Sequence, residues 1–222
     1  NEQQRRIRKR SRPKILLATN YEDALSMYEK YKNNLLGVIS DVGFAMHKEE
    51  DSENEVLDAG LQLVRHIRQD DPMMPVLLQS SQGSIAETAQ ELGVGFLEKY
   101  SKTLMLQLSD YIKEEFGFGD FIFRDSDHIE YGRASNLKEL ETLVTTVPED
   151  VLLRATSKNM LSKWFYARGL FTLGSKVKDV QESHFPTVPA MRAYVSQQIH
   201  DFHALMGRGV IAHFDMDNYG RH

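Results

Sequence analysis

The sequence predicts an α/β protein in which a doubly wound parallel sheet is followed by a second, mainly α-helical domain with a short β-hairpin. Two observations lead to this prediction. Short apolar runs alternate with amphipathic helical patterns through most of residues 13–117, which indicates strand–helix–strand units with right-handed crossovers. The pattern then changes, and a hairpin-like stretch is followed by apolar residues at helical spacing. We therefore divide the chain into 1–12, the end of a preceding helix or a linker; 13–117, the α/β domain; and 118–222, the hairpin with its helical module.

Each predicted strand of the sheet is a short apolar run bounded by polar or turn residues. The four runs are KILLA (14–18), LLGVIS (35–40), PVLLQS (75–80) and GFLEK (95–99). LLGVIS is apolar throughout, as strands buried on both faces of a parallel sheet tend to be. A helical pattern follows each run, so we expect the strands to be parallel.

The second domain begins with FIFRDSDHIEYGRAS (121–135), whose polar centre predicts a hairpin turn. Ser135 is expected to cap the helix that follows. The aromatic residues of LSKWFYARGL (161–170), among them Trp164 and Phe165, are expected in the core of the helical module.

Composition and charge limit the classes of function. The absence of Cys excludes disulfides and thiolate metal sites and makes a cytoplasmic location the default. No apolar stretch reaches the length of a membrane span, so a membrane is not expected as a partner. The net charge is −5, although residues 1–14 hold seven Lys or Arg against one acidic residue. A basic tip without aromatic residues on an acidic body favours a solvated helix end over a nucleic-acid site.

Three polar residues stand at the carboxyl ends of three successive predicted strands. They are Asp41 in VISDV, Ser80 in PVLLQSS and Lys99 in GFLEKY. In open parallel sheets this edge is where ligands bind. A carboxylate nucleophile, a hydroxyl and a cation are the set needed to accept a phosphoryl group and to hold its developing charge.

With these residues, the sequence resembles a response-regulator receiver domain, whose fold is the flavodoxin-like doubly wound sheet. The resemblance implies a phosphoprotein of a two-component phosphorelay, with Asp41 as phosphoacceptor and a histidine kinase or other phosphohistidine protein as donor. It implies that Ser80 hydrogen-bonds the phosphoryl oxygens, that Lys99 pairs with the phosphate and that Phe96 is the switch aromatic. It also implies a Mg²⁺ held by Asp41 and the backbone carbonyl of Gly43, provided that an upstream acidic pair is present.

Two features depart from the receiver pattern, and one rival family shares it. Tyr100 stands where a proline commonly follows the lysine. The chain runs 19 residues from Asp41 to Gly60, and this long loop contains acidic HKEEDSENE (47–55), expected to gate the site or to disfavour further negative charge there. Haloacid-dehalogenase-like phosphatases order the same residue types, but they need a second Asp where this chain has Gly43.

Counting along the chain places KILLA at the second strand of a receiver rather than the first. Asp41 lies only 22 positions after Thr19, which leaves room for one helix and one strand. The resemblance therefore implies that the central first strand, with its acidic pair, is not in this chain. Because a sheet without it would leave two edges unpaired, we expect an upstream segment or a second copy, as in a homodimer, to supply it.

Several segments together resemble a narrower family. They are RPKILLATNYEDAL, LGVISDV, PVLLQSS, FGFGDFIFRD and GRASNLKELETLVTTVP. They are similar to the N-terminal regulatory region of phosphoenolpyruvate synthase or pyruvate, phosphate dikinase-like proteins. The resemblance implies that the region controls attached or partner catalytic domains of that phosphotransferase type. Because none of the synthase catalytic apparatus is visible, we do not expect this chain alone to be an enzyme.

The sequence also allows one alternative function and contains three weaker signals. The alternative is a pseudo-receiver that is never phosphorylated and serves as a docking or dimerisation module. His200 and His203 lack a third metal ligand in sequence. DMDNYG (215–220) matches only the first half of a calcium loop. FGFGDF (116–121) follows a helix rather than opening one, which disfavours a phosphate cradle.

Overall fold

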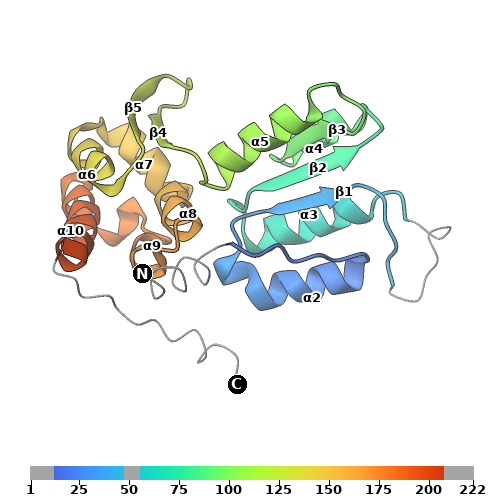
Figure 1. Ribbon diagram of the computed structural model, residues 1–222, viewed down its shortest axis with the longest axis horizontal. Helices are drawn as coiled ribbons and strands as arrows, with labels where there is room; N and C mark the ends of the chain where they lie inside the picture. Colours follow the sequence, from blue (N-terminus) through green and yellow to red (C-terminus); the bar gives the residue numbers. More distant parts are fainter. Residues whose placement is uncertain (1–12, 48–55, 208–222) are drawn as a thin grey trace, which may run out of the picture.

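The computed structural model describes residues 13–47 and 56–207, which form an α/β unit and a mainly helical unit joined by a short connection (Figure 1). The elements of the α/β unit are α2 (Tyr21–Tyr31), η1 (Lys32–Asn34), β1 (Val38–Asp41), α3 (Ala59–Asp70), β2 (Val76–Ser80), α4 (Ile85–Glu91), β3 (Gly95–Glu98) and α5 (Leu104–Glu115). Those of the helical unit are β4 (Phe121–Arg124), β5 (Glu130–Ala134), α6 (Leu137–Thr146), α7 (Glu149–Ser157), α8 (Met160–Ala167), α9 (Phe171–Val177), η3 (Glu182–His184) and α10 (Val188–Gly207). The predictions for 1–12, for most of the acidic loop and for DMDNYG lie outside the described residues.

The sheet of the α/β unit consists of three parallel strands in the order β1-β2-β3. The predicted α/β class with a parallel sheet is thus confirmed. Helices cover both faces. Leu78 of β2 belongs to one apolar cluster with residues of α2, α3 and α4, whereas Tyr111 of α5 lies against the other face and donates a hydrogen bond to the carbonyl of Val76 (2.8 Å). Alternation of side chains along β2 explains how one strand serves both layers.

Residues 14–18 do not form the predicted strand, so this prediction is wrong. The segment has no regular secondary structure, and Ile15 and Leu17 are 95% and 79% exposed. At its end Asn20 pairs in parallel with Ala45, and in Figure 1 the segment runs in the same direction as β1. An apolar run becomes a strand only when a neighbouring backbone pairs with it. No described backbone forms such a ladder with this run.

The strand predicted as buried on both faces is an edge strand instead. Among the described residues, β1 pairs only with β2, so its other edge has no neighbouring strand. Ile39 in its middle is 42% exposed. The apolar sequence therefore predicted correctly that these residues form a strand, but it did not predict that the strand lies at the edge of the sheet. An unprotected edge of this kind is a ready template for pairing with another strand.

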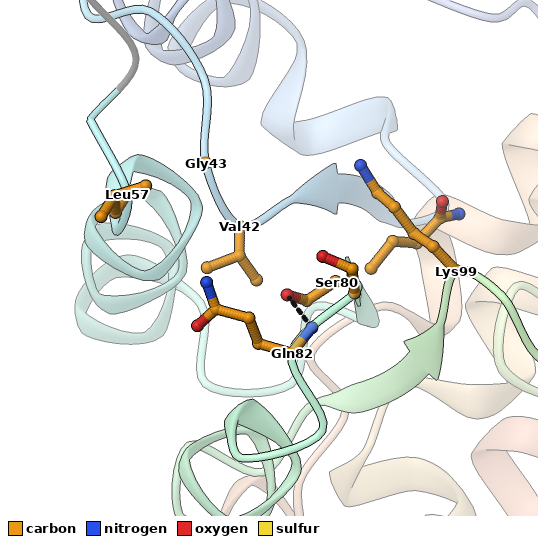
Figure 2. A pocket seen from close by; sticks show the side chains of 8 residues that line it. Val42, Gly43, Leu57, Ser80, Gln82 and Lys99 are labelled. Carbon is orange, nitrogen blue, oxygen red and sulfur yellow. Dashed lines mark hydrogen bonds between the residues drawn. The ribbon is translucent and has the colours of Figure 1, made fainter.

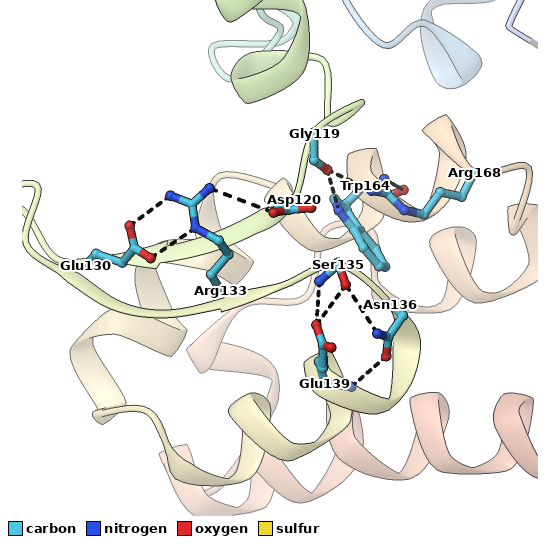
Figure 3. Close-up of polar contacts among 9 residues, drawn as sticks. All are labelled: Gly119, Asp120, Glu130, Arg133, Ser135, Asn136, Glu139, Trp164 and Arg168. Atoms are coloured by element: carbon cyan, nitrogen blue, oxygen red, sulfur yellow. Dashed lines mark hydrogen bonds and ion pairs between the residues drawn. The ribbon is translucent and has the colours of Figure 1, made fainter.

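The helical unit has its own core, and the aromatic residues predicted for it are buried. The two core clusters share no residue, and Trp164 and Phe165 are 1% and 0% exposed. The predicted hairpin is present as antiparallel β4 and β5. The helix cap differs by one residue. Asn136 accepts the amide N–H of Glu139 (3.0 Å), while Ser135 donates its amide N–H to the Glu139 carboxylate (2.8 Å; Figure 3).

The glycines of FGFGDF hold the connection between the units against α8. Gly117 has a φ of +81°, and a Cβ there would lie 3.0 Å from the backbone of Trp164. The carbonyl of Gly119 accepts hydrogen bonds from the indole of Trp164 (3.0 Å) and from Arg168 (2.7 Å; Figure 3). Arg168 also donates to the carbonyl of Gly117 (2.7 Å). These glycines therefore serve close packing and backbone geometry.

Candidate functional site

The three residues singled out in sequence meet at the carboxyl edge of the sheet. Asp41 and Ser80 are the last residues of β1 and β2, and Lys99 directly follows β3. Parallel pairing fixes this arrangement, because Asp41 is in register with Gln79 and Ser80 with Glu98. The amide N–H of Lys99 donates to the carbonyl of Ser80 (3.0 Å). Strand ends thus bring together residues that lie far apart in the chain.

Lys99 and Asp41 form an ion pair across the sheet edge. The distance from Lys99 Nζ to Asp41 Oδ1 is 3.1 Å, and both side chains are substantially exposed. An exposed pair of this kind contributes about 0–1 kcal/mol to stability. The ion pair places a carboxylate oxygen and an ammonium group side by side where a ligand can reach both.

Ser80 is held in place beside this pair. The residue is only 8% exposed, and its Oγ accepts the backbone N–H of Gln82 (3.0 Å). A small open pocket lies at this point, lined by Val42, Gly43, Leu57, Gln79, Ser80, Ser81, Gln82 and Lys99 (Figure 2). The Ser80 hydroxyl keeps a hydrogen that it can donate to a ligand in the pocket.

The chain after Asp41 is fixed by a residue whose role the sequence reasoning missed. Gly60, near the start of α3, donates its amide N–H to the carbonyl of Val42 (2.8 Å). A Cβ on Gly60 would overlap the carbonyl oxygen of Asp41, so only glycine permits this close approach. The available signal was a glycine within an otherwise regular helical pattern, which often marks such a contact.

Phe96, the expected switch aromatic, lies on β3 three residues before Lys99. It is paired in register with Leu78 and is partly buried against the core of the α/β unit. The strand that leads to Lys99 thus carries an aromatic side chain that is neither fully buried nor fully exposed.

The described residues offer an incomplete set of ligands for a metal ion. No group of three or more His, Asp or Glu side chains in the described ranges could hold a metal. At the sheet edge, the carboxylate of Asp41 and the backbone carbonyl of Gly43 are the expected Mg²⁺ ligands. Mg²⁺ commonly takes one or two carboxylates and completes its shell with water and phosphate oxygens. The fit is therefore partial and requires further oxygen ligands.

His200 and His203, for which the sequence offers no third metal ligand, contact a carboxylate far from the sheet edge. Nδ1 of His200 lies 2.8 Å from one oxygen of Glu141, and Nδ1 of His203 lies 3.3 Å from the other. These contacts join α10 to α6, and hydrogen bonding to His200 lowers the pKa of Glu141 below its ordinary value. We therefore interpret the two histidines as a link between α6 and α10.

No protein-family model, no curated protein and no solved structure matches this chain. Among the helices described, none combines the length and the apolar character needed to span a bilayer.

Proposed function

We propose that this region is a phosphorelay signal receiver, in which Asp41 accepts a phosphoryl group on a flavodoxin-like sheet that a further strand completes. The observation that carries the proposal is the 3.1 Å contact between Lys99 Nζ and Asp41 Oδ1 beside Ser80. Because the exposed pair adds little stability, its position is better explained by chemistry. A carboxylate nucleophile beside a cation and a hydroxyl suits phosphoryl transfer.

The proposed step moves one phosphoryl group from a phosphohistidine of a kinase or another donor protein. An oxygen of Asp41 attacks phosphorus, and the new O–P bond forms while the N–P bond to the donor imidazole breaks. The bonding electrons stay on the imidazole nitrogen. The product is an acyl phosphate with added negative charge. Lys99 can follow the charge from the carboxylate to the phosphoryl oxygens, and the Ser80 hydroxyl can donate to one of them.

Mg²⁺ would supply charge neutralisation at the transferring group when it is bound. Asp41 and the carbonyl of Gly43 are the ligands that this chain would contribute. An acidic pair on an added strand next to β1 would provide the oxygen ligands that the described residues lack.

The signal would pass from Asp41 to the surface beside it. We place Phe96 in this role because it lies on the strand that leads to Lys99 and is only partly buried. A charge change at the strand ends would then bias two packings of this aromatic ring. Because the sequence resembles the regulatory region of phosphoenolpyruvate synthase-like proteins, we propose that phosphorylation of Asp41 controls an attached or partner enzyme of that type.

A second candidate function is supported by the unpaired edge of β1. Ile39 of β1 is exposed on a strand whose outer edge has no neighbouring strand among the described residues, and Ile15 and Leu17, in the segment before α2, are exposed as well. A pseudo-receiver that docks a strand of a partner or of a second copy would cover these side chains. In this alternative Asp41 is never phosphorylated, and Lys99 only pairs with it.

Thermal melting with beryllofluoride and Mg²⁺ separates the two candidates. Beryllofluoride imitates a phosphoryl group on a carboxylate, so a receiver should gain about 3 kcal/mol at a hundredfold excess over Kd, which raises Tm by several degrees. We expect this rise in the wild type when the strand that completes the sheet, with its acidic pair, is present, and equally in the control Asp110→Asn, which changes an exposed carboxylate of α5. We expect none in Asp41→Asn. No rise in the wild type, or an equal rise in Asp41→Asn, would overturn the receiver proposal; a dimer in native mass spectrometry would then favour docking.

A further inference from the structure

A second cavity lies between the two units, at the amino ends of the strands. Its volume is about 230 Å³. Pro75, directly before β2, and Gly93, shortly before β3, are among its lining residues, which places it at the opposite end of the sheet from Asp41. The helical unit contributes side chains of α7 and α8, including Lys163 and Trp164. A ligand here would contact both units at once.

Three cations of the helical unit line this cavity without a carboxylate partner. They are Arg154 on α7, Lys158 directly after it and Lys163 on α8. None of them forms an ion pair within 4.0 Å in the part of the chain that the structure describes. The ammonium group of Lys163 donates to the carbonyls of Met73 (2.6 Å) and Lys158 (3.3 Å). Carbonyl dipoles are the neighbours of this partly buried charge.

The protein holds these charges at a cost. Burial lowers the pKa of Lys163 to about 8. Burial, and next the nearby Arg154, lowers the pKa of Lys158. Loss of water around a charge and repulsion between like charges both disfavour the protonated form. An anion placed between these groups would relieve both effects.

The other charged residues around the cavity are largely committed elsewhere. Arg68 donates to the backbone carbonyls of Leu92, Asp71, Met74 and Gly93, with distances between 2.7 and 3.4 Å. Ion pairs of 3.8 Å engage Glu114 with Arg124 and Asp120 with Arg133. Among the acidic lining residues, Glu115 is left, and its charge favours the ammonium forms of Lys158 and Lys163. The excess of charge at the cavity is therefore positive.

We propose that the cavity between the α/β unit and the helical unit binds a small phosphate ester, whose phosphate contacts Arg154, Lys158 and Lys163. A guanidinium and two ammonium groups suit the several oxygens and the double charge of a phosphate. The organic part would lie on the apolar wall around Met73, a flexible side chain that is 43% exposed. The proposal does not depend on the chemistry of Asp41. Because the ligand contacts both units, its binding would stabilise their present arrangement.

Titration calorimetry with phenyl phosphate and with inorganic phosphate tests this site, and the fluorescence of Trp164 gives a second readout. We expect saturable binding of phenyl phosphate to the wild type, weakened about tenfold or more in Lys158→Met and in Arg154→Gln, because each loses a charge-assisted hydrogen bond. Lys176→Met is the control and should bind like the wild type, whereas Lys99→Met tests which of the two pockets holds the ligand. Lys99 belongs to the other pocket, and Lys176 is an exposed lysine of α9.

The pH dependence of binding adds a readout that a merely structural lysine would not change. Lys163 faces Asp71, Glu115, Arg68 and Lys178, and its ammonium form is lost as pH rises through about 8. Affinity for phenyl phosphate should therefore fall between pH 7 and pH 9 in the wild type and fall less in Lys163→Met. A Kd above about 10 mM in the wild type, equal affinity in Lys158→Met, or loss of binding in Lys99→Met would each overturn the proposal.

Discussion

Replacement of Lys163 by Met should change how the stability of the protein depends on pH. Burial holds the pKa of Lys163 at about 8, against 10.5 for an ordinary lysine. Between these two values the unfolded chain binds the proton more than the folded one does, so the free energy of unfolding rises with pH. A shift of this size corresponds to about 3 kcal/mol as an upper bound. Below pH 8 the folded protein carries the full cost of the buried charge.

Urea titrations from pH 7 to pH 10.5 measure this effect. Trp164, the only tryptophan of the chain, is buried in the core of the helical unit and reports its unfolding. The useful quantity is the wild-type unfolding free energy minus that of Lys163→Met, since other titrating groups cancel in the difference. We expect this difference to rise by about 2–3 kcal/mol across the range. In the control Lys176→Met, which removes an exposed lysine, the corresponding difference should stay flat.

A flat difference for Lys163→Met would refute the reasoning. It would mean that the ammonium group remains hydrated in solution and that the hydrogen bond to the carbonyl of Met73 does not fix it between the units. A difference that falls with rising pH would refute it equally, because that sign requires a raised pKa.

Two further substitutions test the packing that supports the sheet edge and the α/β core. Gly60→Ala places a Cβ against the carbonyl of Asp41, so it should cost about 1–3 kcal/mol and slow phosphorylation by acetyl phosphate, whereas Gly83→Ala, with no atom within 4 Å of its Cβ, should change neither. Tyr28→Phe removes the hydrogen bond from the buried phenol to Asp70 (2.9 Å) and should cost about 1 kcal/mol; a urea midpoint equal to that of the wild type would show that this bond adds no net stability.

The elements that follow from a local pattern of apolar residues were predicted correctly. Apolar runs at 35–40, 75–80 and 95–99 correspond to β1, β2 and β3, because strand and helix periods are visible in a single sequence. The meeting of Asp41, Ser80 and Lys99 followed from the same pattern, since the carboxyl ends of neighbouring parallel strands lie at one edge. Trp164 and Phe165 lie in the core as predicted.

What failed or was missed depends on contacts between distant parts of the chain. KILLA has the sequence of a strand, but strand formation needs a partner backbone, which no local pattern reveals. The close approach of Gly60 to Asp41 and the packing of Gly117 against α8 depend on tertiary geometry. The same is true of the cavity around Lys163, whose lining comes from both units. A lysine within a helical pattern reads as surface until the second unit is placed against it.

Covalent transfer to Asp41 is the most direct test of the proposed receiver function. The protein is incubated with acetyl phosphate and Mg²⁺ in a form that includes the strand completing the sheet. Intact-mass spectrometry should then show the addition of one phosphoryl group, labile to hydroxylamine as an acyl phosphate is, and peptide mapping should place it on Asp41. The Asp41→Asn variant should gain no such mass, and the Asp110→Asn control should gain it as the wild type does. Undiminished uptake by Asp41→Asn, or no uptake by the wild type, would contradict the account.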